Sequence, residues 1–318
     1  MRKMYHHPVL LNESIMGLAI KPNGTYVDAT YGGGGHSREI LKRLDNGKLI
    51  AFDQDEDAMN ERIDDERLLL LNHNFRFLKN FLKYYHLSPV DGIIADLGVS
   101  SHQIDTKARG FSSRLEGPLD LRMDQKLEIT ASDIVNNYPE KQLIYIFKTW
   151  GEIKEAVALT REILNARTKR PINTIEQLKE IARSLVPRQK ENKFYAKLLQ
   201  ALRIVVNDEI EALKDLLNQS YESLKPGGRL VILTYQSIED KLVKNYFRTG
   251  NFEGQLEKDF YGKSMKPLML INKKPIVPDA LEITENSRAR SAKLRIAKKT
   301  RKNGREHQER KEGQRLQV

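Results

Sequence analysis

TYVDATYGGGGHS, at residues 25–37, gives the clearest local indication of the architecture of this chain. A short run of β-forming residues leads through four glycines into a helical sequence that ends near Leu44. Glycines let the backbone approach a ligand closely, and the N-terminus of a helix adds a partial positive charge. The order strand, glycine loop, helix therefore predicts a site for a nucleoside-type ligand; a tight turn without a ligand is the alternative.

The alternation of strand and helix continues outward from this loop. A long amphipathic helix is expected at about 196–224, and further strands are expected at 48–53, 68–71, 90–96, 229–235, 268–272 and 292–297. Nearly continuous apolar strands separated by helices are typical of a parallel sheet that is covered on both faces. We therefore predict a Rossmann-like α/β fold with a mostly parallel, seven-stranded sheet, in which the two late strands pair at one edge.

Residues from about 105 to 200 interrupt this pattern, because they contain no convincing strand. Thr174 and Gln177 have the spacing of a capping box, and helical segments are expected at 131–137, 140–148, 152–166 and 174–186. We predict three parts: a discontinuous α/β core at 1–104 and 206–298, an all-helical substrate-recognition insertion at 105–205, and a basic, disordered tail at 299–318.

Three aspartates follow strands of the predicted sheet. Asp28 lies near the end of the first strand, expected at 25–30, while Asp53 ends the second and Asp96 the fourth, at the edge where open α/β sheets bind ligands. An acidic residue at the position of Asp53 commonly binds ribose hydroxyls; the alternative for each aspartate is a helix cap. The loop lacks the third, spaced glycine of dinucleotide sites, and Asp28 before it suits the amino group of S-adenosylmethionine. A methyltransferase is therefore favoured over a nicotinamide-dependent oxidoreductase.

Composition narrows the chemistry. The chain contains no cysteine, which excludes disulfides, cysteine-bound zinc, iron–sulfur clusters and thiolate nucleophiles. Methylation at C5 of cytosine commonly needs a cysteine, so an exocyclic amine, a ring nitrogen or a ribose hydroxyl is the expected acceptor. No group of His, Asp and Glu has metal-ligand spacing, so we expect no metal. No apolar run has the length of a membrane span or a secretory leader, so we expect a cytoplasmic protein without membrane partners.

The charge of the chain is concentrated at its end. The net charge is +11, and residues 288–318 carry twelve Lys or Arg against three Glu. Such a segment attracts polyanions, with a solvated tail of no specific partner as the alternative.

Eight short motifs together resemble one known family. They are HPVLL at 7–11, DATYGGGGHS at 28–37, DLGVSS at 96–101, GFS at 110–112, LDLRMD at 119–124, QALRI at 200–204, KPGGRL at 225–230 and RARSAKLR at 288–295. In this order they resemble the bacterial 16S rRNA (cytosine-N4)-methyltransferase H family, also called MraW, from about residue 5 to 298. Two sites depart from the family pattern: Gln236 stands where the family usually has His, and residues 196–200 differ from its usual string.

The resemblance implies a class I methyltransferase core and S-adenosylmethionine-dependent methylation of the N4 amine of a decoding-centre cytidine. It implies the small ribosomal subunit as partner, and cofactor contacts from Gly34, Gly35, His36, Asp53, Phe75, Asp96 and Gln103. The open alternatives are another RNA target, such as tRNA or a ribose 2′-hydroxyl, and a non-catalytic RNA-binding protein. The chain is expected to be a monomer or a homodimer.

Several residues are candidates for contact with the substrate. Asp96 is expected to position the amine or, alternatively, to bind the cofactor alone; Ser100 is expected to orient the base or to cap a helix. Basic residues expected to hold RNA phosphates are Arg109, Arg114, Arg122, Arg288 and Arg290. For the arginines of the irregular stretch, salt bridges to Asp120 and Asp124 are the alternative.

Overall fold

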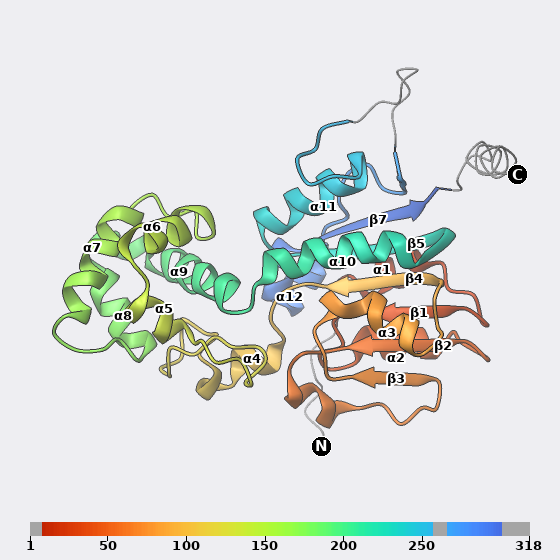
Figure 1. Cartoon of the computed structure of the whole chain (residues 1–318), viewed down its shortest axis with the longest axis horizontal. Helices are drawn as coiled ribbons and strands as arrows, with labels where there is room; N and C mark the ends of the chain where they lie inside the picture. Colours follow the sequence, from red (N-terminus) through yellow and green to blue (C-terminus); the bar gives the residue numbers. More distant parts are fainter. Residues whose placement is uncertain (1–7, 257–265, 301–318) are drawn as a thin grey trace, which may run out of the picture.

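The computed structural model describes residues 8–256 and 266–300, and its centre is one seven-stranded sheet (Figure 1). Its strands are β1 (Thr25–Asp28), β2 (Lys48–Phe52), β3 (Leu68–Leu71), β4 (Val90–Asp96), β5 (Leu224–Thr234), β6 (Leu268–Leu270) and β7 (Lys293–Lys299), in the order β3-β2-β1-β4-β5-β7-β6. β7 is antiparallel to both β5 and β6, and the other neighbours are parallel. The predicted Rossmann-like fold, including the paired late strands, is confirmed.

Helices cover both faces of this sheet. One face packs against α3 (Leu78–Tyr84), α10 (Glu209–Ser223) and α11 (Ser237–Thr249), the other against α1 (Leu11–Leu18) and α2 (Gly35–Leu41). Successive residues of a strand point to opposite faces of the sheet, so Val27 is part of the core under α10 and Tyr26 is part of the core under α1. After β1, the chain adds β2 and β3 on one side of this strand and then crosses to the other side to add β4 and β5. The carboxyl ends of β1 and β4 therefore flank the point at which such folds bind ligands.

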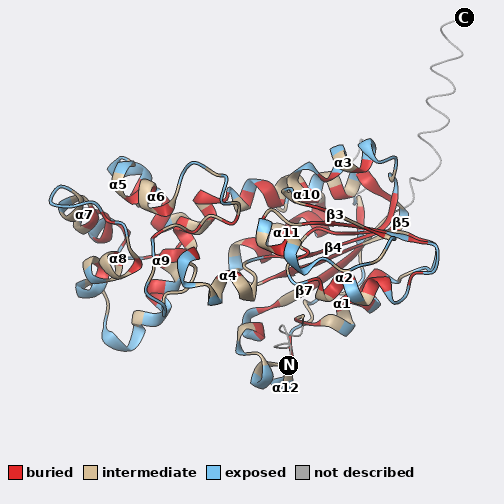
Figure 2. Ribbon diagram, turned by 90° about the horizontal axis from the view of Figure 1, so that it is seen from below, coloured by how far each residue is buried: buried red, intermediate tan, exposed pale blue. Residues whose placement is uncertain are grey.

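Of the helices between β4 and β5, five form a separate bundle, drawn apart from the sheet in Figures 1 and 2: α5 (Ala131–Asn137), α6 (Glu140–Thr149), α7 (Ala156–Arg167), α8 (Ile175–Ala182) and α9 (Glu191–Val206). The short α4 (Ser101–Asp105) follows β4, and α10 packs on the sheet. Side chains from α5 to α9 bury a hydrophobic core of their own, which includes Phe147, Leu159 and Leu202. The capping box of Thr174 and Gln177 begins α8 as predicted.

The prediction of one helix over 196–224 is wrong, because the chain breaks between α9 and α10. Asp208 adopts a left-handed conformation at φ 49°, and the side chain of Asn207 binds the backbone of Leu121 and Met123 instead of continuing the helix. The apolar periodicity persists across this break, so the sequence gives no sign of it.

Two other boundaries differ from expectation. The predicted turn at 225–228 lies within β5 as an irregularity, where Val90 pairs with Leu224 and Gly92 pairs with Arg229. β7 includes Lys299, the first residue of the predicted tail, and residues 301–318 lie outside the described part.

Shorter elements include α12 (Ala280–Glu285) and the 3-10 turns Glu56–Glu61, Phe75–Phe77, Lys107–Arg109, Arg183–Leu185, Arg188–Lys190 and Ser287–Ser291. Within 8–256 and 266–300, no helix has the length and apolar character needed to cross a membrane.

Candidate active site

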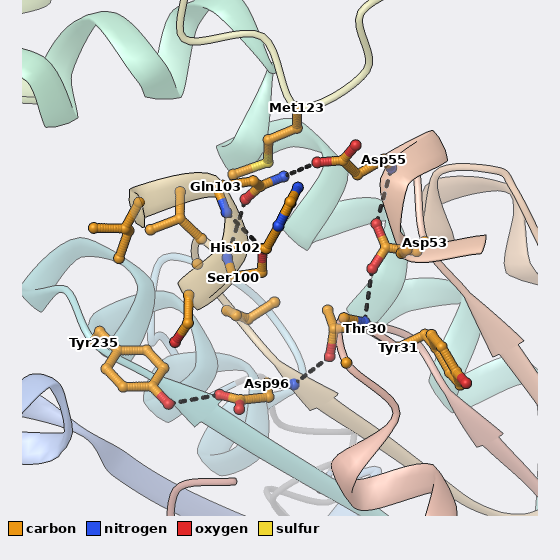
Figure 3. A pocket seen from close by; sticks show the side chains of 18 of the residues that line it. Thr30, Tyr31, Asp53, Asp55, Asp96, Ser100, His102, Gln103, Met123 and Tyr235 are labelled. Atoms are coloured by element: carbon orange, nitrogen blue, oxygen red, sulfur yellow. Dashed lines mark hydrogen bonds between the residues drawn. The ribbon is translucent and has the colours of Figure 1, made fainter. Parts of the chain in front are cut away.

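A cavity of about 1130 Å³ opens at the carboxyl ends of β1, β2, β4 and β5. Its walls come from the glycine loop, from the segments after β2 and β4, from the start of α11 and from α9 of the helical bundle. The cavity therefore lies where the sheet and the helical bundle meet (Figure 3).

Asp28 holds the glycine loop in place through hydrogen bonds. Its carboxylate accepts the Ser37 hydroxyl at 2.6 Å and the Thr30 N–H at 3.1 Å, and burial raises the pKa of Asp28 to about 6. Gly32 and Gly34 have φ values of 53° and 73°, in the left-handed region that favours glycine. Gly35 lines the cavity, whereas Asp28 and Gly34 do not. Asp28 therefore holds the shape of the loop rather than facing the cavity.

Asp53 joins the glycine loop to the turn after β2. Its Oδ2 accepts the N–H of Gly32 at 2.8 Å, its Oδ1 accepts the N–H of Asp55 at 2.8 Å, and burial raises its pKa to about 6. Phe75, the first residue of a 3-10 turn, lines the same cavity. A carboxylate and an aromatic ring at one end of the cavity suit the hydroxyls and the base of a nucleoside.

Asp96, at the end of β4, is held on two sides. Its N–H donates to Thr30 Oγ1 at 2.6 Å, and its Oδ1 accepts the Tyr235 hydroxyl at 2.8 Å (Figure 3). Its Oδ2 lies 4.0 Å from Nδ1 of His36. Burial raises the pKa of Asp96 to about 7, partly opposed by the Tyr235 hydrogen bond and reinforced by the charges of Asp28 and Glu239.

His36 presents an unused polar atom to the cavity wall. Burial lowers the pKa of this imidazole to about 4, so it is neutral at physiological pH. Its Nε2 is buried and has no hydrogen-bond partner within the described part of the chain. Because buried polar groups are generally paired, this atom is a candidate partner for a polar ligand group.

Ser100 caps α4. Its Oγ accepts the Gln103 N–H at 3.2 Å, while Gln103 Oε1 accepts the Ser100 N–H at 3.0 Å. Gln103 Nε2 donates to Asp55 at 2.7 Å. The capping alternative for Ser100 is thus observed, although both residues line the cavity.

Arg109 corrects one expectation. Its guanidinium is buried and donates to Asp55 at 3.0 Å, to Asp57 at 2.7 Å and to the carbonyl of Met123 at 2.8 Å. These bonds contradict the predicted phosphate contact, because they leave the side chain enclosed. Arg109 instead fastens the irregular stretch before the helical bundle to the turn after β2.

The other candidate arginines differ in their exposure and in whether they form ion pairs. Arg122 forms a two-point ion pair with Asp120, at 2.9 and 2.8 Å, as in the salt-bridge alternative. Arg114 and Arg290 are exposed. Arg288 donates to Asp105 at 2.6 Å and lines the cavity, and its buried Nη1 has no hydrogen-bond partner among residues 8–256 and 266–300.

Arg203, Glu209 and Glu239 form a largely buried polar group at the α9 side of the cavity, which sequence reasoning did not assign to the site. Arg203 pairs with Glu209 at 2.7 Å, and burial raises the pKa of nearby Glu239 to about 7. Gln236 Oε1 is also buried without a hydrogen-bond partner among the described residues. Tyr235 follows β5 directly, so the rule that ligands bind at strand carboxyl ends could have identified it.

The family model for the MraW methylase family matches residues 3–300. The chain belongs to this family. This confirms the resemblance seen in the motifs. The MraW-family chain is 55% identical to a protein of Amoebophilus asiaticus over 298 residues, covering 93% of this chain and 96% of that one. It is 53% identical to a protein of Flavobacterium johnsoniae and 54% identical to one of Bacteroides fragilis, each over 93% of this chain and at least 97% of the relative. All three relatives are named ribosomal RNA small subunit methyltransferase H.

Proposed function

We propose that this protein transfers a methyl group from S-adenosylmethionine to the exocyclic N4 amine of a cytidine in the decoding centre of small-subunit 16S rRNA. Membership of the MraW methylase family supports methyl transfer, and the names of the relatives support the ribosomal substrate. We place the reaction in the cytoplasm, with the ribosomal subunits.

The residues of the cavity fit the proposed cofactor. Asp53 would accept the ribose hydroxyls, Phe75 would lie against the adenine, and Gly35, His36 and Gln103 would line the rest of the cofactor site. The cavity of about 1130 Å³ along Gly32, Gly33 and Gly35 leaves room for it, and Nε2 of His36 has no hydrogen-bond partner among the described residues. When bound, S-adenosylmethionine supplies an electrophilic methyl group on a positively charged sulfur.

The proposal rests mainly on the hydrogen bonding of the Asp96 carboxylate. One carboxylate oxygen is fixed by Tyr235, and the other faces His36 at 4.0 Å without a short hydrogen bond. The cytosine amine is a poor nucleophile, because its lone pair is delocalised into the ring. An acceptor for its N–H keeps the lone pair aligned and takes the proton that leaves as the N–CH₃ bond forms. A carboxylate with a pKa of about 7 suits both tasks.

The helical bundle is proposed as the part that recognises RNA. Residues 105–205 would form this insertion, with a core at 1–104 and 206–298, and Leu199 and Arg203 of α9 line the cavity. A stacked base cannot reach the cavity, so the cytidine must be unstacked or single-stranded. Arg114, Arg288 and Arg290, with the basic segment beyond them, are the proposed phosphate contacts.

The test is methyl transfer from labelled S-adenosylmethionine to small ribosomal subunits from a strain that lacks the enzyme, with naked 16S rRNA and tRNA in parallel. After digestion to nucleosides, we expect the label in N4-methylcytidine. Label in 5-methylcytidine, in ribose alone or only in tRNA would overturn the proposed target. Tight RNA binding without any transfer would support the non-catalytic alternative.

A further inference from the structure

The side chain of Tyr235 reaches across the sheet edge to Asp96. β4 and β5 are parallel neighbours, with Asp96 opposite Leu233, so Tyr235 emerges two residues further along, where β5 has ended. Its hydroxyl donates to Asp96 Oδ1 at 2.8 Å, and both side chains line the cavity (Figure 3). The bond therefore joins the end of one strand to the end of its neighbour inside the candidate site.

This phenol is the one hydrogen-bond donor to the Asp96 carboxylate among residues 8–256 and 266–300. The Asp96 backbone is fixed separately through Thr30 Oγ1. Of the carboxylate oxygens, Oδ2 is left facing His36, whose Nδ1 is 4.0 Å away. A carboxylate held at Oδ1 alone has a defined rotamer and a defined free oxygen.

The surrounding charges make this donor more important. The ionisable groups that affect Asp96 or Tyr235 are His36 from α2, Asp28 from β1, Glu239 from α11 and Glu282 from α12. His36 is neutral at physiological pH, because burial lowers its pKa to about 4. Asp28 and Glu239 are carboxyls that oppose a negative charge on Asp96, whereas Glu282 acts on the Tyr235 phenol. The phenol thus stabilises the ionised form that these carboxyls disfavour.

We propose that Tyr235 is a positioning residue for methyl transfer, whose hydroxyl orients the Asp96 carboxylate so that Oδ2 meets the N–H of the acceptor amine. The inference rests on the proposed function and names a residue that the family resemblance did not assign. Tyr235 itself keeps its proton throughout, because burial and the Asp96 charge raise the pKa of the phenol well above its usual value. It acts through Asp96 and takes no part in the proton transfer.

The test is Tyr235→Phe, which removes the hydroxyl and keeps the ring that packs at the cavity wall. A hydrogen bond to a charged group is worth enough to change kcat about ten- to a hundredfold, so we expect a loss in that range. Adenosylhomocysteine affinity should stay within about twofold, because Tyr235 is not assigned to the cofactor. Unchanged kcat would overturn the proposal.

The pH profile separates positioning from packing. Asp96 must be ionised to accept the N–H, so the rate rises as pH rises through its pKa of about 7. The phenol lowers that pKa, and its loss should move the rising limb of the profile to higher pH. A lower rate with an unmoved limb would indicate a packing role and contradict the proposal.

Two further variants complete the experiment. Tyr84→Phe makes the same change on a side chain that is 75% exposed, and it should leave rate and profile unchanged. In Asp96→Asn, adding Tyr235→Phe should cost little more, because the partner is already altered; fully additive losses would refute the link. If wild type produces no N4-methylcytidine, the proposed function fails. If wild type does and Tyr235→Phe equals it, only this inference fails.

Discussion

Replacing Arg109 by Met should destabilise the protein more than most single substitutions. The side chains of Arg109 and Asp55 are each only 6% exposed, and they form an ion pair at 2.9 Å. Asp57 adds a partly exposed partner at 2.7 Å, and the carbonyls of Arg122 and Met123 accept further N–H groups. Removing one partner of a buried pair leaves an uncompensated charge and costs about 3–5 kcal/mol. The ion pair with Asp57 adds little to this loss of stability, because Asp57 is partly exposed.

Urea unfolding followed by circular dichroism measures this cost. The single tryptophan, Trp150, lies in the helical bundle and gives a second, local signal. Lys126→Met is the matched control, because Lys126 pairs with Glu56 at 3.6 Å with both side chains largely exposed; its change should stay within about 0.5 kcal/mol. Asp55→Asn in the Arg109→Met background should recover part of the loss, since it removes the stranded charge. A loss below about 1 kcal/mol for Arg109→Met would show that the buried ion pair contributes little to stability.

Three other experiments test the cofactor site, the glycine loop and the basic segment. Asp53→Ala should weaken adenosylhomocysteine binding about ten- to a hundredfold in calorimetry, because a charged acceptor is lost; equal affinity would contradict the assignment of Asp53. Gly34→Ala should lower the free energy of unfolding by more than the about 1–2 kcal/mol of left-handed strain, since its Cβ would lie 2.8 Å from the Tyr31 ring. Gly227→Ala, whose Cβ would meet only a lysine carbon at 3.9 Å, should show the strain alone, and equal losses would argue against the clash. Deleting residues 301–318 removes six Lys or Arg and three Glu, so RNA binding should weaken and depend less steeply on salt; an unchanged salt slope would exclude the segment from RNA binding.

The sheet could be predicted because its signals are local. Each strand is a short apolar run next to turn residues, and the glycine loop marks the switch between β1 and α2. Asp53 and Asp96 were found for the same reason, since the rule about strand carboxyl ends needs only the strand positions. The helical bundle was indicated by helical periodicity and by the lack of strands.

The remaining features depend on tertiary contacts. The break at Asp208 is set by Asn207 binding backbone groups of Leu121 and Met123, which are more than eighty residues away in the sequence. The role of Arg109 depends in the same way on Asp55, 54 residues earlier. An arginine in a polar, glycine-rich stretch resembles a phosphate ligand in sequence, and only the fold shows that it is enclosed.

The cavity beside the glycine loop is proposed to hold S-adenosylmethionine. A crystal structure of the protein grown with adenosylhomocysteine would show whether it does. We expect the ligand there, with its ribose hydroxyls on Asp53, its adenine beside Phe75 and its sulfur near Asp96. A ligand bound elsewhere, or a cavity filled by side chains with no ligand in it, would rule out this site.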